Sequence, residues 1–483
     1  MKKRLFFAQY LLLIVVLGCA GRQTTSQGWI FLFDGNSLSG WQANENPGSV
    51  TVRNGQIVCQ GPRAHLFYMG DVQKANFKNF ELKAEIMTAP GANSGIYFHT
   101  QFQEKGWPAK GYEVQINNTH RGAGDYRELR KTGSLYAVRN VFKSIVNDDE
   151  WFTLHIVVTG KRIMIRVNDI LVVDYTEPDT PVGSESLAGR HLSSGTFALQ
   201  GHDPDSRVAF RSIMVKPLPD DLPDMEPGRQ PVIDDNYRMI TLLNGQNFPM
   251  IDTHVHLKRN LTLEDALAKS RRAGIFYGIA INSGVGQPVT DDQGLYDFLD
   301  RLNGQPAFVA IQAEGREWVD MFSREAIDKF DYVITDALTF TDDEGKRVRL
   351  WIDKEVDVKD EQAFMEMYVN RIESVFNNES FDIFVNPTFL PKVLADEYDA
   401  LWTPERMQRV IDAAVRNNIA IEINARYRIP SKAFIKLAKQ SDAKFAFGTN
   451  NANENFGNLE YCLEMLQECD LAAVDMFKPG LIE

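Results

Sequence analysis

The sequence predicts two folded domains of different class: a β-sandwich of jelly-roll type, followed by an α/β barrel of parallel strands. Short segments with alternating polar and apolar residues, bounded by Gly, Asn and Pro, recur over residues 28–218 without convincing helices. Over residues 249–483 the pattern changes to strand-like apolar runs that alternate with amphipathic helices. A chain of 483 residues also exceeds the size of one ordinary hydrophobic core.

The expected strands of the first domain are short and are separated by turn signals. They are Gln56–Cys59, Phe80–Met87, Ser94–Thr100, Tyr112–Ile116, Phe152–Thr159, Arg162–Val167, Ile170–Asp174, Thr196–Gln200 and Val208–Val215. The pairs Asn54-Gly55 and Asn168-Asp169 are typical of tight turns between antiparallel strands. Many short strands of this kind favour two packed antiparallel sheets.

The second domain alternates strands with helices. The expected strands are Met250–His256, Phe276–Asn282, Ala307–Ala313, Tyr332–Thr335, Phe381–Val385, Ala420–Asn424 and Lys444–Gly448. Thr262, three residues before Asp265, predicts the start of one helix, and Thr403-Pro404 predicts the start of another. Seven strands joined by helical crossovers predict a parallel, barrel-like fold.

Residues 219–248 are expected to link the two domains. The stretch Pro217–Gln230 is rich in Pro and Asp and has no apolar periodicity, which is typical of an extended connector. Pro231–Phe248 is transitional, and it can pack against either domain.

The N-terminus has the pattern of a secretory signal. Three basic residues precede an apolar run, and Val16-Leu17-Gly18-Cys19 ends it. These four residues resemble a bacterial lipobox, which implies a signal peptide of residues 1–19, acylation of Cys19 and a polar tether over residues 20–27. A plain membrane anchor is the alternative, but about 13 apolar residues are short for a membrane span. We expect a lipid-anchored protein of the bacterial cell envelope, and Ala20 favours the outer membrane, on its periplasmic or surface face.

Charge and cysteine content exclude some classes of protein. A net charge of −13 argues against a nucleic-acid partner, because phosphate binding needs a basic surface. Apart from Cys19, the chain holds Cys59, Cys462 and Cys469, whose spacing matches no disulfide framework or Cys metal motif. We expect these three to be buried thiols.

Polar side chains occupy one face of two expected strands in the first domain. His99 and Gln101 lie two residues apart in one run, and Glu113 and Gln115 lie two residues apart in the next. Residues i and i+2 of a strand project to the same side, so Glu113 and Gln115 are neighbours. A solvated outer face is the simpler interpretation, and a binding face is the alternative.

Five motifs favour the binding face. They are Trp29–Trp41, Asn93–Phe98, Gly111–Ile116, Thr132–Tyr136 and Gly195–Arg211. Together they resemble a family once known only as a domain of unknown function, now described as 3-keto-glycoside lyase/hydratase or 3-keto-disaccharide hydrolase. The resemblance spans nearly all of residues 28–218 and implies a lectin-like fold and an oligosaccharide or glycoside substrate. The family usually has Arg where this chain has His99.

The activity that the resemblance implies has clear chemical requirements. A ketone at C3 of a glycosyl unit acidifies the C2 proton, and the enolate formed by its removal expels the C1 substituent. The product is a 3-keto-2-hydroxyglucal, to which water adds. The site needs a base, donors or a cation for the enolate, and an acid for the leaving oxygen. A divalent ion on the enolate would also suit this chemistry.

The matched motifs supply candidates for these roles. Glu113 is the expected base or a metal-binding carboxylate, and His202 and Arg211 are the candidates for acid and oxyanion roles. The expected substrate-binding residues are Asn93, His99, Gln115, Tyr136 and Gln200, and His65 is a further candidate. For Arg211 the alternative is structural, because it could pair with a carboxylate on a neighbouring strand.

The second domain carries the pattern of a metal site. His254 and His256 end its first strand and project to the same side, as a metal-binding pair requires. This segment, Glu314, Glu422-Ile423-Asn424 and Gly448-Thr449-Asn450 resemble the polymerase and histidinol phosphatase (PHP) family over Met250–Gly480. Other positions depart from that family: Leu338, Asn386, Asn450 and Ala452 replace its later ligands. We expect His254, His256 and Glu314, with Asp252 or Asp336 nearby, to hold at most one divalent ion.

Three functions are compatible with these patterns. The first is an enzyme that cleaves 3-keto-glycosides in the sandwich, as part of carbohydrate catabolism, and it is the one we favour. The second is a carbohydrate-binding sandwich coupled to a one-metal PHP-like hydrolase. The third is a non-catalytic sugar-binding lipoprotein in which both sites are remnants.

Overall fold

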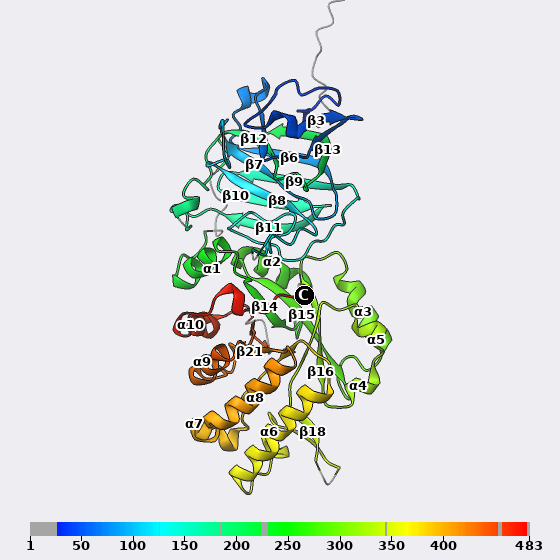
Figure 1. The fold of residues 1–483 in the computed structure, drawn as a ribbon, viewed down its shortest axis with the longest axis vertical. Helices are drawn as coiled ribbons and strands as arrows, with labels where there is room; N and C mark the ends of the chain where they lie inside the picture. Colours follow the sequence, from blue (N-terminus) through cyan, green and yellow to red (C-terminus); the bar gives the residue numbers. More distant parts are fainter. Residues whose placement is uncertain are drawn as a thin grey trace, which may run out of the picture.

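The computed structural model describes residues 27–480, apart from residues 125, 184, 224–229, 343–344 and 453–455. The expected signal peptide, the acylation site Cys19 and most of the tether lie outside the described residues. No helix in the described part of the chain is long and apolar enough to cross a membrane. Figure 1 shows the two domains stacked end to end along the long axis of the molecule.

The first domain is a sandwich of two antiparallel sheets. One sheet has the order β11-β10-β9-β6-β13-β4-β3, with β1 also paired to β13, and the other has the order β2-β5-β12-β7-β8. The strands are β1 (Ile30–Phe31), β2 (Trp41–Ala43), β3 (Val50–Arg53), β4 (Gln56–Cys59), β5 (Ala64–Tyr68), β6 (Phe80–Thr88), β7 (Asn93–Thr100), β8 (Tyr112–Asn117), β9 (Phe152–Thr159), β10 (Arg162–Val167), β11 (Ile170–Thr176), β12 (Thr196–Gly201) and β13 (Val208–Pro217). The predicted sandwich is therefore confirmed.

Aromatic side chains join the two sheets. Phe80 of β6 packs against Phe98 of β7 and Phe197 of β12, with ring centroids 5.7 and 4.9 Å apart. All three rings are almost fully buried, so one face of each sheet forms the common core. The opposite face of the five-stranded sheet remains available for polar side chains, and the candidate site lies there.

The second domain is a closed barrel of parallel strands in the order β14-β15-β16-β17-β20-β21-β22, as the sequence predicts. The barrel strands are β14 (Ile251–Val255), β15 (Phe276–Gly284), β16 (Phe308–Glu314), β17 (Tyr332–Thr335), β20 (Ile383–Phe384), β21 (Ala420–Asn424) and β22 (Phe445–Gly448). A small hairpin of β18 (Thr339–Thr341) and β19 (Arg347–Arg349) lies outside the barrel sheet.

Helices precede, connect and follow the barrel strands. They are α1 (Asp235–Gly245), α2 (Leu263–Ala273), α3 (Asp292–Leu302), α4 (Trp318–Met321), α5 (Arg324–Ile327), α6 (Glu361–Asn378), α7 (Tyr398–Leu401), α8 (Pro404–Arg416), α9 (Lys432–Gln440) and α10 (Glu460–Glu468). The two predicted helix starts are confirmed, because the side chains of Thr262 and Thr403 accept hydrogen bonds from the first turns of α2 and α8.

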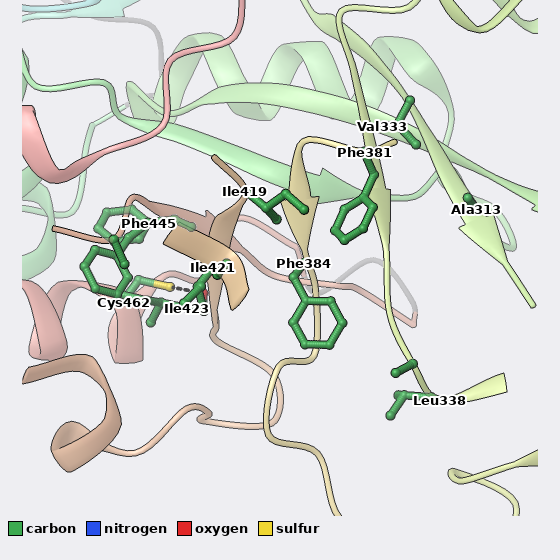
Figure 2. Close-up of a cluster of buried hydrophobic side chains, with 14 of the residues drawn as sticks. Ala313, Val333, Leu338, Phe381, Phe384, Ile419, Ile421, Ile423, Phe445 and Cys462 are labelled. Carbon is green, nitrogen blue, oxygen red and sulfur yellow. Dashed lines mark hydrogen bonds between the residues drawn. The ribbon is translucent and has the colours of Figure 1, made fainter. Parts of the chain in front are cut away.

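Apolar side chains fill the layer between strands and helices. In Figure 2, Phe384, Ile421, Ile423 and Phe445 come from three neighbouring strands and gather near Cys462 of α10. The Cys462 thiol donates a hydrogen bond to the carbonyl oxygen of Ile423 at 3.1 Å. The three described cysteines are all buried and unbridged, in agreement with the prediction.

A long segment of the sandwich, between β8 and β9, docks on the end of the barrel where the strands begin. Phe142 packs edge-on against Phe276, and Lys143 forms an ion pair with Asp331 at 2.6 Å. Asn140 donates to the carbonyl oxygen of Asn244 at 2.9 Å, so helix α1 of the predicted linker joins this interface. Helix α2 lies between the two domains (Figure 1). The domains therefore share a buried, hydrogen-bonded contact.

Candidate functional site

A cleft of about 540 Å³ lies over the outer face of the five-stranded sheet. Its floor comes from β7, β8 and β12, and its walls come from the loops around Trp107 and Arg190. The polar side chains that line it include Asn93, Tyr97, Glu113, Gln115, Glu128, Tyr136, Glu185, Arg190, Gln200 and His202. Pockets for small molecules usually span roughly 300–1,000 Å³, so the cleft has the size of a ligand site.

Glu113 is the central carboxylate of the cleft. It is only 4% exposed. Its Oε1 accepts a hydrogen bond from Gln200 Nε2 at 2.8 Å, and its Oε2 accepts one from Arg190 Nη2 at 3.1 Å. A carboxylate has about four acceptor positions, so these two bonds leave acceptor capacity for a ligand.

A glycine on the neighbouring strand makes room for this carboxylate. A Cβ atom on Gly95 would lie 2.6 Å from Glu113 Oε1, far inside ordinary contact distance. Gly95 belongs to β7, and Glu113 lies opposite Tyr97 in the ladder between β7 and β8. The missing side chain at Gly95 therefore allows the Glu113 carboxylate to lie across β7.

Arg190 is the cation of the site. Burial disfavours its charged form, but Glu113, Tyr97 and Tyr136 together outweigh burial and raise the pKa of the guanidinium above its ordinary value. The guanidinium also lies over the rings of Tyr97 and Tyr136, at 5.4 and 5.5 Å from their centroids. Its Nη1 is buried and makes no hydrogen bond.

Two buried polar atoms in the cleft lack partners within the protein. One is Arg190 Nη1, a donor, and the other is Gln200 Oε1, an acceptor. Buried polar atoms nearly always have a hydrogen-bond partner, so an unpaired donor and an unpaired acceptor in one cleft point to a polar ligand or water. A molecule with both hydroxyl and carbonyl groups would satisfy both atoms.

Two tyrosines and two amides complete the cleft. Tyr97 accepts a hydrogen bond from Gln200 at 3.1 Å, and burial together with Glu113 raises its pKa well above the ordinary value. Burial also raises the pKa of Tyr136. Gln115 donates to Asn93 at 2.7 Å. Both phenols therefore keep their protons and can donate hydrogen bonds to a ligand.

A second ion pair contacts Tyr136. Arg130 lies over the Tyr136 ring at 4.2 Å from its centroid and pairs with Glu128 at 3.3 Å. Arg130 also donates to the carbonyl oxygen of Gly245 at 3.2 Å. The same arginine thus contacts the site and the linker helix that joins the barrel.

His202 lies at the rim of the cleft. Its Nδ1 is 2.5 Å from Asp203 Oδ2, and this contact orients the ring. The ring lies 5.3 Å from Trp107 and 6.1 Å from His120, measured between centroids. A histidine oriented by a carboxylate in this way can move a proton at its other nitrogen.

Six of the predicted residues therefore meet in the cleft: Asn93, Glu113, Gln115, Tyr136, Gln200 and His202. The expectation for Arg211 is corrected. Arg211 lies on β13 of the other sheet, where its side chain is 43% exposed and pairs with Glu85 at 2.9 Å. Phe210 points into the core, so alternation directs Arg211 outward, away from the cleft.

The expectation for His99 is also corrected. Its φ of +54° interrupts the alternation of β7. Its ring packs against Phe80 and Phe98 in the sandwich core instead of facing the cleft. Both ring nitrogens have backbone partners, at Lys78 and Ser193, and burial lowers its pKa to about 4. His99 is a satisfied structural histidine.

His65 lies next to the cleft without lining it. Its ring contacts both Tyr97 and Trp107, each at 5.4 Å between centroids. Neither of its nitrogens has a hydrogen-bond partner, and burial lowers its pKa to about 3. The imidazole is therefore neutral at physiological pH and serves as a packing surface beneath Trp107.

The sequence-based prediction missed Arg190, Tyr97 and Trp107. Tyr97 could have been predicted, because it follows Asn93 by four residues on one strand and so projects to the same side. Arg190 and Trp107 lie in irregular loops, where no periodicity shows which way a side chain points. Their contribution becomes visible only when the loops are placed against β8.

The expected metal ligands of the barrel lie at the end where the strands stop, but the donors do not fit one ion. His254 Nδ1 is 2.6 Å from Glu422 Oε1, and His254 Nε2 is 3.0 Å from Gln312 Oε1. Both ring nitrogens of His254 thus contact protein acceptors. Among the residues that the structure describes, no three His, Cys, Asp or Glu side chains form a group that could hold a metal ion.

Amide side chains fill this end of the barrel instead. Gln312 Nε2 and Asn282 Nδ2 each donate to Glu314 Oε1 at 3.0 Å. Asn386 Nδ2 donates to Asp336 at 3.1 Å. Burial, followed by the nearby Asp336, raises the pKa of Glu314 to about 8. Amides therefore satisfy carboxylates that a metal would otherwise bind, and the predicted ligand set is corrected to a buried polar network.

Comparisons with known proteins show what the first domain is similar to. The model of a family described as the 3-keto-alpha-glucoside-1,2-lyase-like domain matches residues 28–216. The 3-keto-disaccharide hydrolase of Bacteroides thetaiotaomicron is 27% identical over 232 residues, which cover 40% of this chain and 79% of that protein. The resemblance predicted for the first domain is confirmed.

Solved structures give weaker likenesses. One comes from Parabacteroides distasonis, and its name as a glycosyl hydrolase is itself provisional. It is 22% identical, covers 40% of this chain and 95% of its own, and has a TM-score of 0.34. Histidinol phosphate phosphatase from Lactococcus lactis is 12% identical, with coverage of 46% and 95% and a TM-score of 0.35. The specific resemblance of the barrel to the PHP family stays a prediction.

Proposed function

We propose that the sandwich cleaves 3-keto-glycosides in the cleft around Glu113, by removal of the C2 proton and elimination of the C1 substituent. The observation that carries this proposal is the contact between Glu113 and Arg190, which places a carboxylate and a cation together in one ligand-sized cleft. The family match over residues 28–216 supports the choice of a 3-keto sugar.

In the first step, Glu113 takes the proton from C2, and the electrons of the C2–H bond form a C2=C3 double bond with negative charge on the C3 oxygen. Arg190 is the group best suited to stabilise that charge, because its Nη1 is a buried donor without a partner. The Tyr97 and Tyr136 hydroxyls, which keep their protons, can donate to the same oxygen or to neighbouring hydroxyls.

In the second step, the C3 carbonyl re-forms, a C1=C2 double bond forms, and the bond between C1 and the leaving oxygen breaks. The leaving oxygen needs a proton, and His202 at the rim is the candidate acid. The product is a 3-keto-2-hydroxyglucal. Addition of water, with oxygen at C1 and hydrogen at C2, gives the free 3-keto-sugar, and the sum of the steps is hydrolysis.

The test uses the full-length protein and a 3-keto-disaccharide, with NMR detection of the glucal and the 3-keto-sugar. Glu113→Gln keeps the shape of the side chain and removes the base, so we expect turnover to fall by at least about 10³-fold. Glu85→Gln is the matched control, because Glu85 pairs with Arg211 on the other sheet. Equal activity of the two variants would refute the role of Glu113.

Further experiments test the alternative functions. If the barrel were the catalytic domain, His254→Ala would abolish turnover and Glu113→Gln would not. Incubation with a chelator tests whether the sandwich reaction uses a divalent ion. Sugar binding without turnover of any 3-keto-disaccharide would instead support a non-catalytic binding protein.

We also propose that Cys19 carries a lipid that anchors the protein in the bacterial cell envelope. The proposal rests on the lipobox-like sequence that ends at Cys19. Replacement Cys19→Ala should move the protein from the membrane fraction to the soluble fraction, and unchanged membrane association would contradict lipid anchoring.

A further inference from the structure

We propose that Trp107 forms a second sugar subsite at the rim of the cleft, so that the enzyme favours oxidised disaccharides over 3-keto-glycosides of small alcohols. The inference rests on the proposed function and extends it to the choice of substrate. Trp107 lines the cleft and is 42% exposed. A large aromatic side chain left exposed beside a ligand site is a candidate contact surface for the ligand.

The loop around Trp107 is held by its own hydrogen bonds. Gln103 Nε2 donates to the Trp107 carbonyl oxygen at 2.9 Å, and Gln103 Oε1 accepts from Ala109 N at 3.2 Å. Gly106 N donates to Glu45 Oε1 at 3.2 Å, which ties the loop to the segment that follows β2. The backbone that presents Trp107 is therefore fixed before any ligand binds.

The indole ring is also fixed by its neighbours. Arg63 lies over it at 5.1 Å from the centroid and is itself paired with Glu45 at 2.7 Å. His65 and His202 contact it at 5.4 and 5.3 Å between centroids. Because the ring already has a defined position, ligand binding loses little side-chain entropy there.

A chain of contacts joins Trp107 to the reacting centre. His65 touches both Trp107 and Tyr97, Tyr97 accepts a hydrogen bond from Gln200, and Gln200 donates to Glu113. If the oxidised sugar lies against Glu113 and Arg190, its C1 substituent extends along the cleft. Trp107 lines the same cleft beside His202, the expected acid for the leaving oxygen.

The chemistry of the surroundings fits a second sugar ring. A pyranose has C–H groups on its faces and hydroxyls around its edge. An aromatic ring can cover the C–H groups, while His202, which lines the same cleft, can bond to the hydroxyls. A methyl group in place of the second sugar would contact far less of this surface. Trp107 should therefore affect disaccharides more than methyl glycosides.

The kinetic test compares kcat/KM for 3-keto-disaccharides with kcat/KM for methyl 3-keto-glucosides. For Trp107→Ala we expect a loss of about tenfold or more with the disaccharide and less than about twofold with the methyl glycoside. Trp107→Phe should recover part of the loss. Trp351→Ala is the matched control, because Trp351 is 38% exposed but belongs to the barrel. Equal losses with both substrates, or none, would overturn the subsite.

A binding test separates this inference from the proposed function. The Glu113→Gln variant is titrated with unoxidised maltose, cellobiose and methyl glucoside, with and without the additional change Trp107→Ala. Loss of disaccharide affinity alone supports the subsite even if no 3-keto substrate is turned over. Affinities that do not depend on residue 107 refute the subsite while leaving the proposed reaction intact.

Discussion

Replacement of Gly95 by alanine tests the geometry of the cleft without replacing a polar residue. The added Cβ would lie 2.6 Å from Glu113 Oε1, where ordinary contact begins at 3.4 Å, so about 0.8 Å of space is missing. The nearest atom is the end of a side chain, so the fold can adapt by moving the Glu113 carboxylate. Such a movement breaks or stretches its hydrogen bonds to Arg190 and Gln200.

The expected effect of Gly95→Ala is large on activity and moderate on stability. A displacement near 1 Å in an active site costs about 10²-fold in rate, equivalent to about 2.7 kcal/mol of transition-state stabilisation. Loss of the two hydrogen bonds should cost about 1–3 kcal/mol of unfolding free energy. The loss of activity is measured as kcat/KM on a 3-keto-disaccharide, and the loss of stability is measured from a thermal unfolding curve.

The control for Gly95→Ala is Gly48→Ala, because a Cβ at Gly48 would meet no atom within 4 Å. This variant should retain wild-type kcat/KM. Full activity of Gly95→Ala would refute the reasoning, because catalysis would then not depend on the position of the Glu113 carboxylate across β7. Loss of activity that only parallels unfolding would refute it as well.

Further predictions concern pH, the barrel and the outer sheet. Burial lowers the pKa of His65 to about 3 and that of His99 to about 4. Below about pH 6.5 the unfolded chain therefore binds protons that the folded chain does not. As the pH falls from there to its folded pKa, each histidine should lower the unfolding free energy by about 1.4 kcal/mol per pH unit. Chemical denaturation of His65→Phe across this range should give a shallower slope than wild type, and an unchanged slope would contradict the assignment. His254→Ala removes the partner of buried Glu422 and should cost about 3–5 kcal/mol of stability while leaving turnover of a 3-keto-disaccharide in the folded protein unchanged. Arg211→Ala should stay within about twofold of wild-type kcat/KM, because its exposed pair with Glu85 contributes about 0–1 kcal/mol and lies on the other sheet.

Periodicity predicted most of the fold because it reports directly on burial. The two packed sheets and the seven parallel strands follow from periods of two and from strand–helix alternation. The strand β5 was missed, because Ala64–Tyr68 is buried on both faces and shows no alternation. It places His65 beneath Trp107, a contact that no local pattern indicates.

The site was predicted in part because a strand period gives the side on which a residue lies but not which sheet it belongs to. Glu113, Gln115 and Asn93 could be placed together from neighbouring strands. Arg211 could not be excluded, because an outward residue of either sheet has the same local pattern. Arg190 could not be found, since its position depends on an irregular loop that forms a wall of the cleft.

The arrangement of the described residues does not support the metal prediction for the barrel, and the reason is physical. The pair His254 and His256 is present, but a ligand set requires that the remaining donors be free to bind an ion. Gln312, Asn386 and Asn450 supply donors that occupy the carboxylate and amide acceptors nearby. Amide side chains at these positions thus make this end of the barrel a hydrogen-bonded core.

The fate of the hydrogen at C2 tests the account most directly. The full-length protein is incubated with a 3-keto-disaccharide in D₂O, and the products are followed by NMR against an enzyme-free control and against Glu113→Gln. Elimination followed by hydration predicts that the released 3-keto-sugar carries deuterium at C2, or that the reaction stops at a glucal without hydrogen there. Release of a 3-keto-sugar that retains its original hydrogen at C2 would contradict proton removal by Glu113.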